Sequence, residues 1–264
     1  MTQTFVLTVA AGAIVGGFAQ GLSGFAFGLV SMSIWAWTIE PRLAAALAIF
    51  GALTGQIISA ITVRRGFDVA TLLPFILGGL VGIPIGVLLL PHLDIEIFKA
   101  CLGIFLVLWC PVMLFARKIP PIGDGGGKAA DGVVGMIGGI MGGIGGFSGP
   151  VPSLWCTLRQ MDKDKQRSII QNFNLVTLAF ALAASVIGGS VTTDMLPTFG
   201  IVAASVLVPV LLGGRLYIGI SEANFRRIVL TLLTCSGIAL LASSVPNLFA
   251  RTHADAPATQ KAAP

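Results

Sequence analysis

Eight long apolar blocks, separated by short polar connections, restrict most strongly how this chain can fold. Several of them reach the roughly 20 residues that an α-helix needs to cross about 30 Å of hydrocarbon. A backbone inside lipid must satisfy its own hydrogen bonds, and the alternation over about ten residues that marks a transmembrane β-strand is absent. The sequence therefore predicts an all-α polytopic membrane protein with blocks at approximately residues 5–39, 43–63, 72–90, 97–115, 133–158, 169–191, 199–212 and 228–249.

Composition agrees with a membrane protein and excludes several other classes. Only 10% of the residues are charged, against about 25% in a typical soluble domain, and the mean hydropathy is +0.94. The net charge of +5 comes from cations in the short connections, where Lys and Arg orient a chain in the bilayer. Nucleic-acid binding is therefore not expected. The first apolar run has no preceding cation and no clear cleavage site, so no signal peptide is expected either.

The sequence lacks the residue clusters that carry catalytic chemistry. The four cysteines lie inside apolar blocks at unrelated spacings, so they are expected to pack as small hydrophobic side chains, with no disulfide framework and no metal site. The carboxylates fall at or near the connections, which gives no internal proton relay. No catalytic triad, zinc motif or phosphate-binding loop is present. We expect neither an enzyme nor a bound cofactor.

A weak internal duplication divides the chain into two halves. "GLSGFAFG" at 21–28 resembles "GIGGFSGP" at 143–150, and "IEIFKACLGIFLVL" at 95–108 resembles "EANFRRIVLTLLTC" at 222–235. A polar segment rich in Pro and Gly separates the halves. We expect a first transmembrane repeat at 1–118, a linker at 119–130, a second repeat at 131–250 and a disordered tail at 251–264.

The positions of the cations favour an inverted relation between the two repeats. If the first block of each repeat is a broken or re-entrant hairpin, three full spans follow it and the repeats have opposite orientations. With the amino terminus outside, the inner side then carries all 16 Lys and Arg residues except Arg42, Lys99, Arg251 and Lys261. Eight simple spans would divide the cations almost evenly, which fits the positive-inside rule less well.

A glycine-rich, partly polar stretch interrupts the first block of each repeat. The stretches are "GFAQGLSGFAFG" at 17–28 and "GGIMGGIGGFSGPVPS" at 138–153, where Pro150 and Pro152 disfavour a continuous helix. We expect a short helix to begin near residues 23–25 and another near 147–149. A helix amino terminus with free N–H groups favours anions. The alternative is that the glycines, such as the pair Gly82 and Gly86, serve only close helix packing.

A second group of polar residues opens the block after the second interruption. In "RSIIQNFNLVT" at 167–177, Gln171 and Asn174 lie three residues apart and so on one helix face, with Asn172 beside them. Amides inside a membrane are costly unless they find partners or face a polar cavity. Both a substrate role and a role in holding helices together are open. The first repeat has a weaker counterpart in Thr54 and Gln56.

Together these stretches resemble the sulfite exporter TauE/SafE family of bacterial membrane permeases. The resemblance rests on "GFAQGLSGFAFGLVSM", "GGIMGGIGGFSGPVPSLW", "RSIIQNFNL" and the apolar blocks, over nearly the whole chain. It implies a secondary permease of the bacterial inner membrane that moves a small sulfur-containing or organic anion, such as sulfite, sulfoacetate or another sulfonate. The family often has a proline after the glycines in both stretches, whereas the first stretch here has none.

The combined interpretation is a permease with an anion site between the two interruptions and with its amino terminus in the periplasm. Ser23, Ser148 and backbone N–H groups would bind the anion, and the amides would line the route. Its partners would be a small anionic substrate and the lipid bilayer, with a coupling proton or sodium ion and a homo-oligomer left open. An anion channel and a transporter of a non-sulfur anion are the alternatives. The predicted site residues are Gln20, Ser23, Gly24, Phe25, Gly146, Phe147, Ser148, Gly149, Gln171, Asn172 and Asn174.

Overall fold

Helices make up most of the residues that the computed structural model describes, which are 2–62, 66, 68–116, 119–120, 122–123, 126–216 and 222–254. Helix accounts for 86% of the structure. The first half contains α1 (Gln3–Ser23), α2 (Phe27–Trp35), α3 (Pro41–Thr62), α4 (Val69–Leu89) and α5 (Ile95–Phe115). The second half contains α6 (Gly127–Gly145), α7 (Pro150–Leu158), α8 (Lys163–Ile187), α9 (Leu196–Leu216) and α10 (Glu222–Ala254).

Seven of these helices are long and apolar enough to cross a membrane, namely α1, α3, α4, α5, α8, α9 and α10. Short 3-10 turns precede α5 (Leu90–His92) and α9 (Thr193–Met195). The predicted class, an all-α polytopic membrane protein, is confirmed. The helix α6 begins inside the segment predicted as a linker, and α10 ends four residues inside the segment predicted as a tail. Residues 255–264 of that tail lie outside the described residues.

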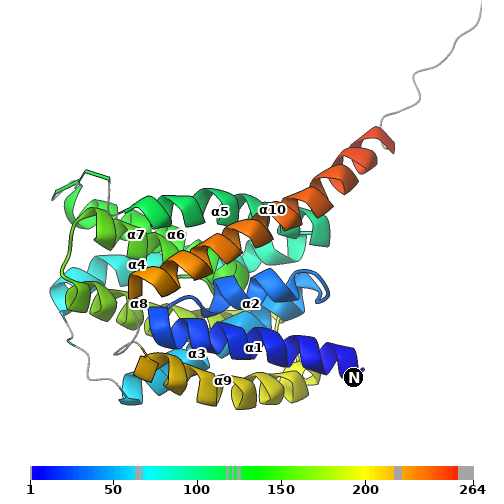
Figure 1. Cartoon of the computed structure of the whole chain (residues 1–264), viewed down its shortest axis with the longest axis horizontal. Helices are drawn as coiled ribbons and strands as arrows, with labels where there is room; N and C mark the ends of the chain where they lie inside the picture. Colours follow the sequence, from blue (N-terminus) through cyan, green and yellow to red (C-terminus); the bar gives the residue numbers. More distant parts are fainter. Residues whose placement is uncertain are drawn as a thin grey trace, which may run out of the picture.

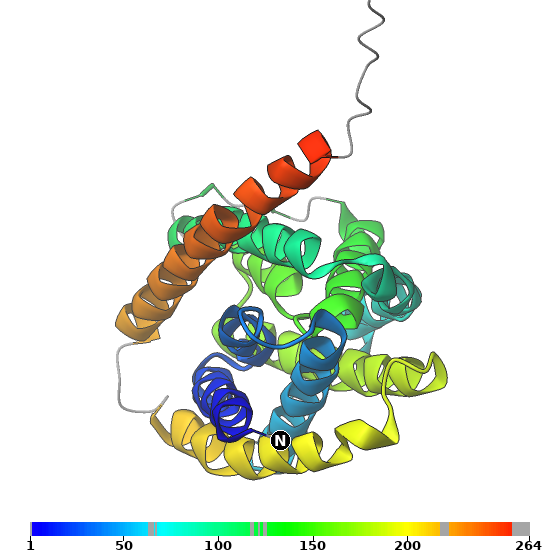
Figure 2. The same ribbon diagram turned by 90° about the vertical axis from the view of Figure 1, so that its right-hand side faces the viewer.

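Both halves have the same order of helices and pack in a reciprocal way (Figures 1 and 2). Each half runs long, short, long, long, long, and the short helices α2 and α7 both have 9 residues. The helix α1 packs along α9, and its counterpart α6 packs along α4; α3 packs on α8, and α5 packs on α10. Exchanging the two halves therefore reproduces the same set of pairs. This is the pattern expected of two structural repeats.

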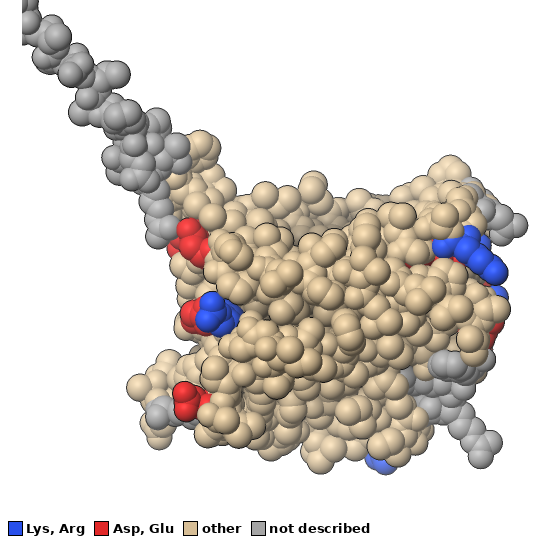
Figure 3. Space-filling view, turned by 180° about the vertical axis from the view of Figure 1, so that it is seen from behind, with Lys and Arg blue, Asp and Glu red and all other residues tan. Residues whose placement is uncertain are grey.

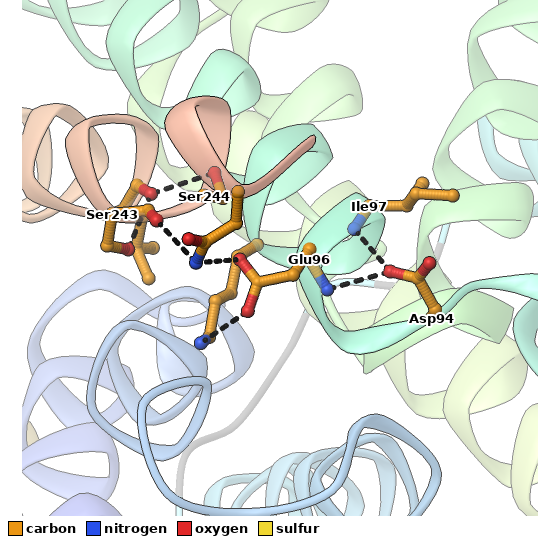
Figure 4. A network of polar contacts seen from close by, with 8 residues as sticks. Asp94, Glu96, Ile97, Ser243 and Ser244 are labelled. Atoms are coloured by element: carbon orange, nitrogen blue, oxygen red, sulfur yellow. Dashed lines mark hydrogen bonds and ion pairs between the residues drawn. The ribbon is translucent and has the colours of Figure 1, made fainter. Parts of the chain in front are cut away.

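The corresponding helices α5 and α10 run in opposite directions. Near the start of α5, the carboxylate of Glu96 accepts hydrogen bonds from Lys99 Nζ and from Asn247 Nδ2 near the end of α10, each at 3.4 Å. In the same view Asp94 caps α5 by accepting from the backbone N–H groups of Glu96 and Ile97 (Figure 4). Since the start of α5 meets the end of α10, the pair is antiparallel. An inverted relation between the repeats would produce this direction.

Glycines allow α4 and α6 to pack with their backbones in contact. A Cβ atom added to Gly82 would overlap the carbonyl oxygen of Met136, and one added to Gly139 would overlap the carbonyl oxygen of Gly79. Such close approach increases van der Waals contact between helices in lipid, where the hydrophobic effect contributes little. The packing alternative therefore holds for these glycines, including the predicted pair Gly82 and Gly86, whose added Cβ atoms would both overlap the α6 backbone.

On the face of the bundle that Figure 3 shows, charged side chains gather at the two ends, with an uncharged belt between them. One end, here called the cation-rich end, holds the carboxyl ends of α3, α5, α7 and α9 and the amino ends of α4, α6, α8 and α10. Two contacts join elements at this end, since Lys165 of α8 pairs with Asp68 at the start of α4 and the Ile122 N–H donates to the Leu158 carbonyl at the end of α7. The elements at this end carry the described cations Lys128, Arg159, Lys165, Arg167, Arg215 and Arg227, and those at the other end carry Arg42 and Lys99.

This distribution agrees with the predicted one as far as the described residues go. Hydrogen bonds from Thr71 hold the pKa of Asp68 below its ordinary value, so this surface carboxylate is ionised when it pairs with Lys165. Which end faces the cytoplasm remains a prediction. Four cations of the predicted inner set and one of the outer set lie outside the described residues, namely Arg64, Arg65, Arg117, Lys118 and Lys261. The side chains of Lys163 and Arg226 of the inner set and of Arg251 of the outer set are not described either.

Candidate functional site

Both interrupted blocks fold into antiparallel helical hairpins. At the base of the first hairpin, Trp35 Nε1 of α2 donates to the Thr8 carbonyl of α1 at 3.1 Å. At the base of the second, Asp131 of α6 accepts from Trp155 Nε1 at 2.7 Å and from Arg159 Nη1 at 2.8 Å. Each hairpin starts and ends at the same end of the bundle, which confirms the predicted breaks. The two hairpins enter from opposite ends.

The tip of the first hairpin turns at Gly24, which has a φ of 86°. This left-handed conformation costs a side-chain-bearing residue about 1–2 kcal/mol, so glycine suits the position. The Ser23 hydroxyl donates to the Ala19 carbonyl and accepts from the N–H groups of Phe25 and Ala26. These bonds delay the start of α2 to Phe27, two residues later than the predicted window.

The tip of the second hairpin turns at Gly146, which has a φ of 72°. The helix α7 begins at Pro150, one residue after the predicted window, because proline suits the first turn of a helix. Ser148 is 1% exposed, and its hydroxyl donates to Asn174 Oδ1 at 2.8 Å. The protons of both predicted serine hydroxyls are thus donated within the protein. In this conformation they shape the breaks and are not offered to an anion.

The two tips pass each other near the middle of α3. The Gly24 carbonyl accepts from Gln56 Nε2 at 2.6 Å, whereas Gly146 packs on the backbone of Ala48 and Ile49. The two contact residues on α3, Gln56 and Ala48, are eight residues apart, which corresponds to about 12 Å along the helix axis. Gly28 packs on the Gly146 carbonyl, and Gly149 packs on Phe25. The predicted residues of the two tips therefore meet in one region, here called the hairpin crossing.

Three buried glutamines surround the first tip, each about 1% exposed. Gln20 Nε2 donates to the Ala52 carbonyl at 2.9 Å, Gln56 bonds to Gly24, and the side chain of Gln171 packs against Gly24. Within the described part of the chain, Gln20 Oε1 and Gln171 Nε2 are buried and make no hydrogen bond. Sequence reasoning noted Gln56 only as a weak counterpart of the second-half amides and did not place it in the site.

The amide side chains of α8 point in two different directions. Gln171 and Asn174 face the hairpin crossing, since Gln171 packs against Gly24 and Asn174 contacts Ser148 and Gly149. Asn172 points elsewhere, because its Nδ2 donates to the Gly66 carbonyl at 3.2 Å. The Ser168 hydroxyl donates to the same carbonyl. The structure therefore brings Gln171 and Asn174 into the predicted site, and it places Asn172 against the α3–α4 connection.

The side chains at the crossing are amides, hydroxyls and aromatic rings. Phe147 is 6% exposed and stacks on Phe105 of α5, with ring centroids 6.2 Å apart. The amino terminus of α2 contributes the partial positive charge of a helix end. The amino terminus of α7 offers fewer donors, because Pro150 and Pro152 have no N–H group. Hydrogen-bond donors to an oxygen-rich ligand are therefore concentrated at the first tip.

Comparison with protein families identifies the chain. The family model described as "Sulfite exporter TauE/SafE" matches residues 8–240. The chain belongs to this family. TauE/SafE proteins are membrane transporters of sulfite or related anions rather than enzymes. With its seven candidate spans, the protein is a multi-pass membrane protein of the transporter class. Neither the comparison with curated proteins nor that with solved structures found a match.

Proposed function

We propose that the protein is a secondary permease that carries a small sulfur-containing or organic anion, such as sulfite, sulfoacetate or another sulfonate, across the bacterial inner membrane. Its binding site is the hairpin crossing. The observation that carries this proposal is Gln171 Nε2, a buried donor without a hydrogen-bond partner that lies against the first tip. An oxyanion would supply the missing acceptor.

The energetic argument rests on the cost of an unpaired donor. Leaving a buried polar group unsatisfied costs about 1–3 kcal/mol, and a hydrogen bond to a charged group recovers about 1.5–3 kcal/mol. The partial positive charge at the start of α2 adds to the attraction. No full charge is needed at the crossing for modest affinity. Weak binding also suits a transporter, because the substrate must leave as well as enter.

The repeat architecture supports alternating access as the transport mechanism. The pairs α3/α8 and α5/α10 join corresponding helices of the two halves, and the contacts of Glu96 with Asn247 and of Gly66 with Ser168 make both pairs antiparallel. Inverted repeats commonly form a substrate site where their broken helices meet, and they open that site to the two sides in turn. We therefore keep the predicted periplasmic amino terminus, which places the cation-rich end in the cytoplasm.

Transport is tested directly with the purified protein in liposomes. Labelled sulfite is the substrate, and sulfoacetate, sulfate and an aliphatic carboxylate are competitors, with and without a pH or sodium gradient. Saturable uptake that sulfonates inhibit is expected, and gradient dependence would identify the coupling ion. Non-saturating electrical current would instead indicate an anion channel. No uptake of any anion by correctly inserted protein would refute the proposal.

The role of Gln171 is tested by Gln171→Met, which keeps the side-chain length and removes the donor. We expect the KM for the transported anion to rise about 10- to 100-fold. Gln3→Met is the matched control, because Gln3 is exposed at the first residue of α1. Equal KM values in both variants would move the binding site away from Gln171.

A further inference from the structure

One face of α8 carries an arginine in addition to the two amides of the crossing. Arg167, Gln171 and Asn174 occupy positions i, i+4 and i+7, which come round to the same side of an α-helix. Arg167 lies one turn nearer the cation-rich end than Gln171, about 6 Å along the helix axis. Sequence reasoning counted this arginine only as one of the cations that orient the chain.

The hydrogen bonds of neighbouring α8 residues show which way this face points. On one side, Gln166 Nε2 donates to the Ser153 carbonyl and to Thr157 Oγ1 of α7. On the other side, Ser168 and Asn172 both bond to the Gly66 carbonyl. Arg167 lies between these two directions, as Gln171 and Asn174 do. The residue is half-buried and its Nε atom is inaccessible to solvent, so at least this part of the side chain is enclosed by the protein.

The first tip is accessible next to this face. Ser23 lies on the same face of α1 as Gly16 and Gln20, because the three residues have the spacing i, i+4 and i+7. Gly16 packs on Ser31 of α2, and Gln20 bonds to the Ala52 carbonyl of α3. This is the inward face of α1, whereas the exposed Leu7 and Ile14 face outward. Ser23 is nevertheless exposed. Among the described residues, none covers the Ser23 side chain beside the first tip, although it lies on an inward face.

We infer that the hairpin crossing is reached from the cation-rich end past Ser23, and that Arg167 is the residue that selects anions on this approach. The inference rests on the proposed transport of an anion, and it adds the entrance and the charge that recognises the substrate. A positive charge about one helical turn before the neutral donor Gln171 attracts an anion without holding it at the crossing.

Thiol labelling tests the entrance independently of transport. In full-length protein whose Cys101, Cys110, Cys156 and Cys235 are replaced by alanine, Ser23→Cys is exposed to small anionic and cationic methanethiosulfonates added at the cation-rich end. We expect faster labelling by the anionic reagent. Arg167→Gln should lower the ratio of anionic to cationic rates about 10-fold, and Arg167→Lys should preserve it. Lys165→Gln is the matched control, because Lys165 pairs with Asp68 at the surface.

An unreactive Ser23→Cys in folded protein, or a rate ratio that Arg167→Gln leaves unchanged, would overturn the inference. Because labelling needs no transported substrate, these results stay interpretable if sulfite uptake fails.

A second measurement uses transport with native Ser23, in case the cysteine disturbs the tip. Arg167→Gln should raise the KM about 10-fold, leave kcat nearly unchanged and remove the increase of KM with ionic strength. Arg167→Lys should retain most of the wild-type affinity. A fall in kcat at constant KM in both variants would indicate a purely structural role for Arg167 and overturn the inference.

Discussion

The two hairpins use the same backbone device in different chemical surroundings. Both turn at a glycine in the left-handed conformation and continue into a helix of 9 residues. The first tip is surrounded by the amides of Gln20, Gln56 and Gln171. The second tip packs on the backbone of Ala48 and Ile49, and its flanking Phe147 stacks on Phe105. Binding chemistry is thus concentrated at one tip, while the other provides a firm surface against which it packs.

Their bases differ as well. Neutral hydrogen bonds from Trp35 to the Thr8 carbonyl and from Ser31 to the Gly12 carbonyl close the first hairpin, whereas the buried carboxylate of Asp131 binds both Trp155 and Arg159 in the second. Hydrogen bonds between a guanidinium and a carboxylate are shorter and stronger than neutral ones. From this difference we expect the second hairpin to be the more rigid of the two and the first to carry the ligand.

The largest effect on transport is expected from wedging the two tips apart. A Cβ atom at Gly149 would lie 2.5 Å from Phe25 Cβ and 2.8 Å from Asn174 Nδ2. Gly149→Leu should therefore separate the tips and reduce uptake to the background of empty liposomes. Gly200→Leu is the matched control, since nothing lies within 4 Å of a Cβ atom added at that position. Normal uptake by folded Gly149→Leu would show that tip contact is unnecessary for transport.

A second prediction concerns the stability of glycine-to-alanine variants, which distinguishes the cost of backbone strain from the cost of a steric clash. Gly146→Ala places a Cβ atom 2.8 Å from the backbone of Ala48 and Ile49, in addition to the cost of its positive φ. The expected loss of stability is about 2–5 kcal/mol. Gly189 has a φ of 69° and open space around its added Cβ atom, so Gly189→Ala should cost only about 1–2 kcal/mol.

Gly24→Ala should fall between these two variants, because its nearest neighbour is the side chain of Gln171 at 3.2 Å and not a backbone. Apparent melting temperatures in detergent give the order directly. If Gly24→Ala were the most destabilising, the first tip would be the more rigid one, contrary to the expectation from the two bases.

The sequence was sufficient to predict the helical class and both breaks, because clustered glycine and proline weaken a helix wherever they occur in an apolar block. Periodicity also placed Gln171 and Asn174 on one face. It could not show that Asn172, one residue along, would bind the Gly66 carbonyl, since that partner is distant in the chain. The start of α2 was predicted too early because the Ser23 hydroxyl occupies two N–H groups before the helix begins. The importance of Gln56 likewise depended on a tertiary contact with Gly24.

The smallest effect is expected from the two serines, and it tests whether they shape the tips or bind the substrate. Ser148→Ala leaves the buried Asn174 Oδ1 without its donor, which should cost about 1–3 kcal/mol of stability. Ser23→Ala removes a cap at an exposed tip and should cost about 0.5–2 kcal/mol. Because both hydroxyl protons are donated within the protein, the KM should change much less in either variant than in Gln171→Met. A tenfold rise of the KM in Ser23→Ala, without a loss of stability, would instead make its hydroxyl a direct ligand. The anion would then be bound by the turn itself, and the difference between the two tips would lie in their serines as much as in the glutamines around them.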